Sequence, residues 1–175
     1  MPCQATGLLP KPAVRRTVRN MTRASAYLSA YAADHQNPVN RRLHTICVPI
    51  IVVSLLGLLW SVPVPVAAAT LPTYVNWAGV TVVAALLWYL LLAPRLALGM
   101  AVGAALALAA VAVLDRLEIP LWMTSAALFL AAWAGQFVGH AFEGRRPSFL
   151  RDLRFLLIGP LWVMSGLYAR LGIPA

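Results

Sequence analysis

The chain has 175 residues, of which 61% are hydrophobic and 11% are charged, and its mean hydropathy is +0.78. Soluble domains usually carry about 25% charged residues, so this composition excludes an ordinary soluble protein and predicts a membrane protein. Fourteen Lys and Arg against five Asp and Glu give a net charge of +9, which is typical either of nucleic-acid binding or of membrane topology.

The N-terminal segment 1–30 is basic and contains no acidic residue. No apolar region that could belong to an ordinary signal peptide follows until about Ile46, which is too far along the chain. We therefore expect a flexible cytosolic tail at 1–30 and an integral membrane helical domain at 31–175. A transit peptide, with Met21 as a second candidate start, is the alternative.

Five apolar runs follow the tail. Crossing a hydrocarbon layer about 30 Å thick takes roughly 20 helical residues, and four runs reach that length: 45–65, 74–93, 95–114 and 119–139. The fifth, 154–172, contains one proline and two glycines, and it either crosses, re-enters or lies along the interface. The predicted fold is all-α, a polytopic membrane bundle of four to five transmembrane or re-entrant helices.

The first run has a clear helix start. Asn37 can cap the helix, and Pro38 fits the first helical position, where its missing N–H costs nothing. Pro49 is expected to bend this helix about three turns later. Further along, Pro94 and Arg95 are the predicted link of a tight antiparallel hairpin.

A GxxxG pattern at Gly99 and Gly103 permits close helix contact in the third run. In an Ala-rich helix the pattern indicates close packing without specifying its partner. It therefore leaves a homo-oligomer open.

The basic residues frame the apolar runs. If the N-terminus is cytoplasmic, the positive-inside rule places all of them on the cytoplasmic side except Arg116 and Arg170. They show no interleaved aromatic platform, so we expect a lipid bilayer as partner and no nucleic acid. The predicted location is a bacterial inner membrane or the endoplasmic reticulum.

This topology brings the three histidines of the chain to one face of the membrane. His35 and His44 lie at the entrance of the first run, and His140 lies at the end of the fourth. Asn40 and His44 are four residues apart and share a helix face, and His35 precedes the cap. The turn can present two imidazoles to one ion, or Asn37 merely caps the helix and both histidines are interfacial polar residues.

A second polar cluster ends the fourth run. Gln136, His140 and Glu143 recur at helical spacing and form a polar stripe on an otherwise apolar helix. Such stripes are costly in a membrane and usually face the bundle interior. His140 and Glu143 can reach one metal, or the carboxylate can orient the ring. The alternative is a surface salt bridge from Glu143 to Arg145 or Arg146.

Together the clusters offer three imidazoles and a carboxylate. This N/O ligand set suits Fe(II), zinc or manganese, and it allows a mononuclear site at most. The sequence contains no G-x-S-x-G elbow, no H-E-x-x-H motif and no Gly-rich phosphate loop.

The segments "YAADHQNPVNRRLHTICVP" (31–49) and "WAGQFVGHAFEGRRPSFL" (133–150) resemble the two signatures of the family long filed as domain of unknown function 962. Its characterised members are fungal endoplasmic-reticulum 2-hydroxy fatty acid dioxygenases of phytosphingosine degradation. The resemblance covers roughly 25–172. Ser148 stands where the family commonly has Ala.

The resemblance implies an Fe(II)-dependent dioxygenase that uses O2 to shorten a long-chain 2-hydroxy fatty acid by one carbon. Its implied metal ligands are His35, His44 and His140, with Glu143 as the least secure member of the site. Substrate-binding roles are expected for Asn37, Asn40, Gln136, Arg145 and Arg146. The alternatives are a small non-enzymatic membrane protein and a different metal-dependent lipid enzyme, such as a zinc hydrolase.

Overall fold

A computed structural model describes residues 23–65, 75–144 and 156–174. These residues form α-helices and no β-strand, which confirms the predicted all-α fold. The helices of this described part are α2 (Arg23–Ala33), α3 (Pro38–Trp60), α4 (Trp77–Leu92), α5 (Pro94–Leu114), α6 (Leu121–Glu143) and α8 (Ile158–Arg170). Residues 23–30, which the sequence assigns to the tail, belong to α2, and residues 1–22 lie outside the described part.

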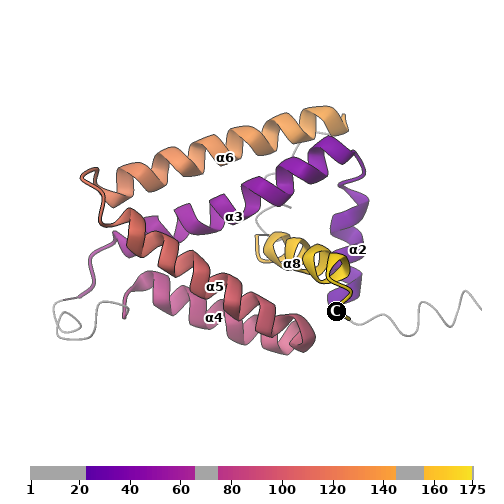
Figure 1. The fold of residues 1–175 in the computed structure, drawn as a ribbon, viewed down its shortest axis with the longest axis horizontal. Helices are drawn as coiled ribbons and strands as arrows, with labels where there is room; N and C mark the ends of the chain where they lie inside the picture. Colours follow the sequence, from indigo (N-terminus) through magenta and orange to yellow (C-terminus); the bar gives the residue numbers. More distant parts are fainter. Residues whose placement is uncertain (1–22, 66–74, 145–155, 175) are drawn as a thin grey trace, which may run out of the picture.

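Helices α3 and α6 lie side by side and antiparallel, and they share the most extensive helix contact in the described structure (Figure 1). The start of α3 is as predicted: the Asn37 side chain accepts a hydrogen bond from the Val39 N–H, and Pro38 occupies the first turn. Pro49 lies inside α3 without ending it. At the far end of the pair, Gly57 lies directly against Ser125, because two small residues let the helix backbones approach closely.

The hairpin of α4 and α5 turns more tightly than the sequence predicts. Ala93 alone separates the two helices, so Pro94 and Arg95, expected to form the link, open α5 instead. A proline at the first helical position lacks an N–H that would be unpaired there in any case, and its fixed φ favours the helix. The two helices lie next to each other in the lower part of the fold (Figure 1).

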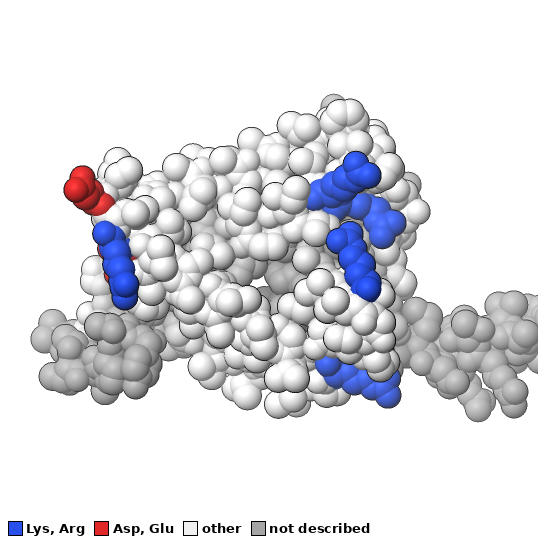
Figure 2. Space-filling model, in the orientation of Figure 1, with Lys and Arg blue, Asp and Glu red and all other residues white. Residues whose placement is uncertain are grey.

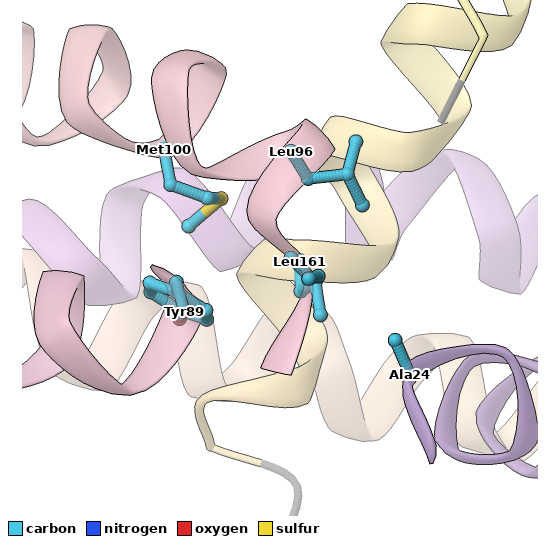
Figure 3. Close-up of a cluster of buried hydrophobic side chains, with 6 residues drawn as sticks. Ala24, Tyr89, Leu96, Met100 and Leu161 are labelled. Atoms are coloured by element: carbon cyan, nitrogen blue, oxygen red, sulfur yellow. The ribbon is translucent and has the colours of Figure 1, made fainter. Parts of the chain in front are cut away.

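A buried apolar cluster joins this hairpin to α8 and α2. Figure 3 shows Leu161 of α8 among Tyr89, Leu96 and Met100, with Ala24 of α2 at its edge. Burial of large apolar side chains here excludes water and holds the helices together.

The predicted close packing at Gly99 serves this α8 contact. A Cβ at Gly99 would lie 2.8 Å from the Tyr168 hydroxyl, and that hydroxyl accepts a hydrogen bond from the Gly99 N–H at 3.1 Å. Met164 lies against the same glycine and contacts a Cβ built at Gly103 at 3.5 Å. The GxxxG face therefore receives a helix of its own chain.

Three of the described helices, α3, α5 and α6, are long and apolar enough to cross a membrane. The predicted second span, α4, is apolar but has 16 residues, and α8 in the fifth run has 13. A helix rises about 1.5 Å per residue, so α8 is shorter than a full crossing requires. The sequence prediction of a helical membrane bundle is confirmed.

Charged side chains occupy the two ends of the molecule. Figure 2 shows Lys and Arg at both ends of this face, acidic side chains at one end, and an uncharged surface between them. The end with acidic side chains belongs to the turn between α5 and α6, where Asp115, Arg116 and Glu118 are exposed. The uncharged belt is the surface that a hydrocarbon layer would contact.

Candidate metal centre

The first part of the site is the corner between α2 and α3. His35 lies in this corner, where its backbone N–H donates to the Ala32 carbonyl at 3.2 Å and so extends the end of α2. The α3 helix then begins at Pro38 and carries His44 on its inner face, one turn after Asn40. Both imidazoles are buried, with exposed fractions of 4% each.

The second part of the site is the C-terminal end of α6. Gln136 and His140 are buried there, so the predicted polar stripe does face the bundle interior. Between them Gly139 leaves room for α3: a Cβ at this position would lie 2.5 Å from the Asn40 Oδ1. Because the glycine has no side chain, α6 approaches α3 closely and brings His140 next to His44.

The three imidazoles meet in one buried group. Ring centroids lie 4.2 Å apart for His35 and His44, 5.1 Å for His44 and His140, and 5.5 Å for His35 and His140. One ring nitrogen from each residue lies within 4.8 Å of the other two, so the group could hold a metal ion. Three neutral imidazoles are an established ligand set for a divalent metal with open positions.

The hydrogen bonding of the rings fits this role. The Nε2 atoms of His35 and His44 are buried and have no hydrogen-bond partner among the described residues. A buried polar atom without a partner is costly, and a metal ion between the rings would use both lone pairs. Burial also lowers the pKa of His35, which favours the neutral imidazole that binds metals.

Glu143 lies beside this group with both carboxylate oxygens engaged. Its Oε1 accepts the backbone N–H of Gln36 at 2.9 Å, and its Oε2 accepts the backbone N–H of Asn37 at 2.9 Å and the Asn40 Nδ2 at 3.0 Å. The Asn37 side chain also donates to the Phe142 carbonyl at 3.0 Å. These bonds join the start of α3 to the end of α6.

The remaining predicted residues have separate positions. Asn37 and Asn40 take part in the contact with Glu143, and Asn40 is fully buried. Gln136 lines a pocket beside the histidines. Arg145 and Arg146 lie outside the described residues, and so does the predicted salt bridge to Glu143. A described cation near the group is Arg41, whose guanidinium lies 5.9 Å from the Trp162 ring centroid.

Tyr31 is a site residue to which the sequence analysis gave no role. It is buried, its backbone carbonyl oxygen lies 2.7 Å from the His35 Nδ1, and its hydroxyl lies 3.0 Å from the His44 Nδ1. Its ring also stacks on His35 at a centroid distance of 4.2 Å. The available signal was its position one helical turn before His35.

His44 and His140 open onto a pocket of about 60 Å³ between α3, α6 and the start of α8. Besides Tyr31, His44, His140 and Gln136, the lining is apolar: Val48, Ile51, Val52, Trp133, Phe137, Leu156, Gly159 and Pro160. Along α3 the lining runs from His44 to Val52, about 12 Å at the usual helical rise. The arrangement places a nitrogen ligand set at one end of an apolar slot.

Comparison with known proteins gives two matches. Residues 21–171 match the family described as 2-hydroxy-palmitic acid dioxygenase Mpo1-like. The chain is also 30% identical over 147 residues to the 2-hydroxy-palmitic acid dioxygenase MPO1 of Saccharomyces cerevisiae, an alignment that covers 83% of this chain and 79% of the yeast protein. No solved structure matches the chain.

Proposed function

The chain belongs to the 2-hydroxy-palmitic acid dioxygenase Mpo1-like family, and from this membership and the three-histidine group we propose that it is an Fe(II)-dependent dioxygenase. Its proposed substrates are O2 and a long-chain 2-hydroxy fatty acid, which it shortens by one carbon. The observation that carries the proposal is the pair of unpartnered Nε2 atoms at one end of an apolar slot.

His35, His44 and His140 would hold the metal. Fe(II), when bound, supplies one-electron chemistry with O2, which no amino-acid side chain provides by itself. A 2-hydroxy acid suits the same site, since its adjacent hydroxyl and carboxylate oxygens could both bind the metal. Glu143 remains a further candidate ligand, although its oxygens already accept hydrogen bonds.

Other residues of the pocket would bind the acyl chain and the carboxylate of the substrate. The apolar walls contributed by α3 and α6 suit an acyl chain, because burying each methylene stabilises binding by about 0.8 kcal/mol. The carboxylate is left at the polar end, where Gln136 lies, and where Arg145 or Arg146 would pair with it. Access of the acyl tail from a bilayer explains why such an enzyme is membrane-embedded.

We assign the histidine end to the cytoplasmic side of a bacterial inner membrane or of the endoplasmic reticulum. This orientation rests on the distribution of Lys and Arg in the sequence and on the exposure of Arg41 and Arg42 next to the site. The opposite end carries Asp115, Arg116 and Glu118. Acidic residues contribute little to the orientation of a protein in the membrane, so the assignment depends on the excess of Arg near the histidines.

The test is a single anaerobic preparation of the full chain in detergent. Wild-type protein is expected to contain about one iron per chain, to consume O2 with 2-hydroxypalmitate and to release the acid one carbon shorter. Replacing His140 with Ala should remove both the metal and the activity. Ser125→Ala is the matched control, since Ser125 is also buried on α6 but lies four turns away from the histidines.

Two results would favour other functions, and a third would contradict the proposed ligands. If the purified chain contains no stoichiometric metal and histidine replacements have no effect on it, the result would indicate a non-enzymatic membrane protein. Stoichiometric zinc without O2 uptake would indicate a different lipid enzyme. Full O2 uptake and product formation by the His140→Ala variant would contradict the proposed ligand set.

A further inference from the structure

Tyr31 contacts two of the three candidate ligands through two different groups. Its backbone carbonyl lies 2.7 Å from the His35 Nδ1, and its hydroxyl lies 3.0 Å from the His44 Nδ1. The two bonds come from opposite ends of one residue, so the position of Tyr31 relates the two rings to each other. Tyr31 is itself buried, with 6% of its surface exposed.

The carbonyl contact determines where the proton of His35 lies. A backbone carbonyl only accepts hydrogen bonds, so the Nδ1 of His35 must carry the proton and donate it. In a neutral imidazole the other nitrogen then holds a lone pair. That nitrogen, Nε2, is the one that is buried without a partner among the described residues.

The hydroxyl contact determines the position of the His44 proton in the same way when the Nε2 lone pair of His44 binds a metal. With Nε2 bound to a metal, the proton of the neutral ring resides on Nδ1, which then donates to the Tyr31 hydroxyl oxygen. Phenylalanine in place of Tyr31 would leave this N–H buried with no acceptor. The bond to His35 comes from the backbone and would survive that substitution.

The packing around Tyr31 restricts its hydroxyl to this position. Its ring stacks on His35 with an interplanar angle of 14° and has Trp162 of α8 at a centroid distance of 5.4 Å. A Cβ at Gly159 would lie 3.4 Å from the hydroxyl oxygen, so α8 leaves just enough room for it. Neighbours from the corner after α2, from α3 and from α8 therefore surround the residue.

From these contacts we infer that Tyr31 is a positioning residue of the metal site, which holds His35 and His44 as Nδ1–H tautomers with both Nε2 atoms directed to one metal ion. The inference rests on the proposed function, since it assumes that the histidines bind a metal. It adds a residue that does not touch the metal and acts through the orientation and tautomer of two ligands.

The experiment compares Tyr31→Phe with Tyr89→Phe in the full chain in detergent. Tyr89 is a matched control because it is also buried and its hydroxyl also makes a hydrogen bond, which it donates to the Leu157 carbonyl at 2.8 Å, away from the histidines. Co(II) is the probe, since its visible absorption reports both affinity and ligand geometry. We expect Tyr31→Phe to weaken Co(II) binding by about 10- to 100-fold and to alter the spectrum, and Tyr89→Phe to do neither.

A second measurement needs no variant. The chain has three histidines, so its Zn(II)-loaded form labelled with ¹⁵N-histidine gives six ring-nitrogen signals. We expect protonated Nδ1 and zinc-bound Nε2 for His35 and His44. Zinc bound through Nδ1 of either ring would overturn the inference even if Tyr31→Phe did not fold.

The outcomes separate the two proposals. If wild-type protein binds neither Co(II) nor Zn(II), the proposed function fails and the inference fails with it. If wild type binds Co(II) and Tyr31→Phe binds it with equal affinity, the inference alone is overturned. An equal loss of affinity in Tyr31→Phe and Tyr89→Phe also overturns it, because general packing would then explain the effect.

Discussion

At the scale of single residues, Glu143 shows how a side chain can support the three-histidine group although both of its oxygens already accept hydrogen bonds. It lies at the N-terminus of α3, where the unpaired backbone N–H groups of a helix favour an anion. Its oxygens accept two backbone N–H groups and the Asn40 amide, across more than 100 residues of sequence. These contacts hold the corner that carries His35 against the helix that carries His140. Its role as a metal ligand stays a prediction.

Replacing Glu143 with Gln separates these two roles. Gln keeps the shape but has one acceptor oxygen, and its NH2 group would face a donor that now lacks a partner. We expect a loss of about 1 kcal/mol of stability, seen as a lower Tm in detergent, with one metal still bound per chain at saturating Co(II).

The control for this substitution is Glu118→Gln. Glu118 is exposed at the opposite end of the molecule, and its replacement should leave both Tm and metal content unchanged. Loss of stoichiometric metal in Glu143→Gln at normal Tm would instead make Glu143 a ligand.

At the scale of the helices, the α3–α6 crossing determines whether the two motifs meet. Small residues lie at both ends of this contact: Gly57 packs against Ser125, and Gly139 packs against Asn40. In a membrane, association depends on such close van der Waals packing, since the lipid is as apolar as the helix surfaces. The spacing between α3 and α6 therefore sets the distance between His44 and His140.

Gly139→Ala should disturb the site through this spacing. The added Cβ would lie 2.5 Å from the Asn40 Oδ1, so α6 must move away from α3. We expect overpacking to cost about 1 to 3 kcal/mol and Co(II) affinity to fall as His140 moves. Thermal unfolding and Co(II) titration of the same preparation measure both effects.

Gly166→Ala provides the comparison. A Cβ there meets nothing within 4 Å, and alanine is the better helix former by about 0.5 to 1 kcal/mol, so α8 should be unchanged or slightly more stable. Equal Co(II) affinity in Gly139→Ala and Gly166→Ala would show that the helix spacing does not control the site.

At the scale of the whole molecule, charge and length divide the protein into two ends and an apolar middle. The end with the histidines exposes Arg41 and Arg42, and the other end exposes Asp115, Arg116 and Glu118. The helices between them are apolar, and three are long enough to cross a membrane. The histidine group thus lies at one end of the apolar middle of the described structure.

Cysteine labelling tests the proposed orientation in a bacterial inner membrane. In a Cys3→Ser background, where the remaining Cys47 is buried, we expect a membrane-impermeant maleimide to label Glu118→Cys in intact cells. Arg42→Cys should be labelled only after the cells are permeabilised. The reverse pattern would place the metal site on the outer face.

Much of the local structure could be predicted from the sequence. Asn37 and Pro38 begin α3 as their chemistry dictates, and the apolar runs predicted the later helices and the membrane class, but not α2. The polar spacing of Gln136 and His140 also predicted correctly that both face inward. These features depend on neighbouring residues in the chain, and a helix repeats every 3.6 residues whatever surrounds it.

The sequence by itself thus determined the helical membrane class, the start of α3 and the two motifs that contain the histidines. Only the tertiary structure decided that Tyr31 contacts two of the rings, that Glu143 joins α3 to α6, and that α8 packs on Gly99. These contacts join residues up to 107 positions apart. The angle and spacing of packed helices set them, and side-chain shape at each crossing fixes that geometry rather than any local pattern.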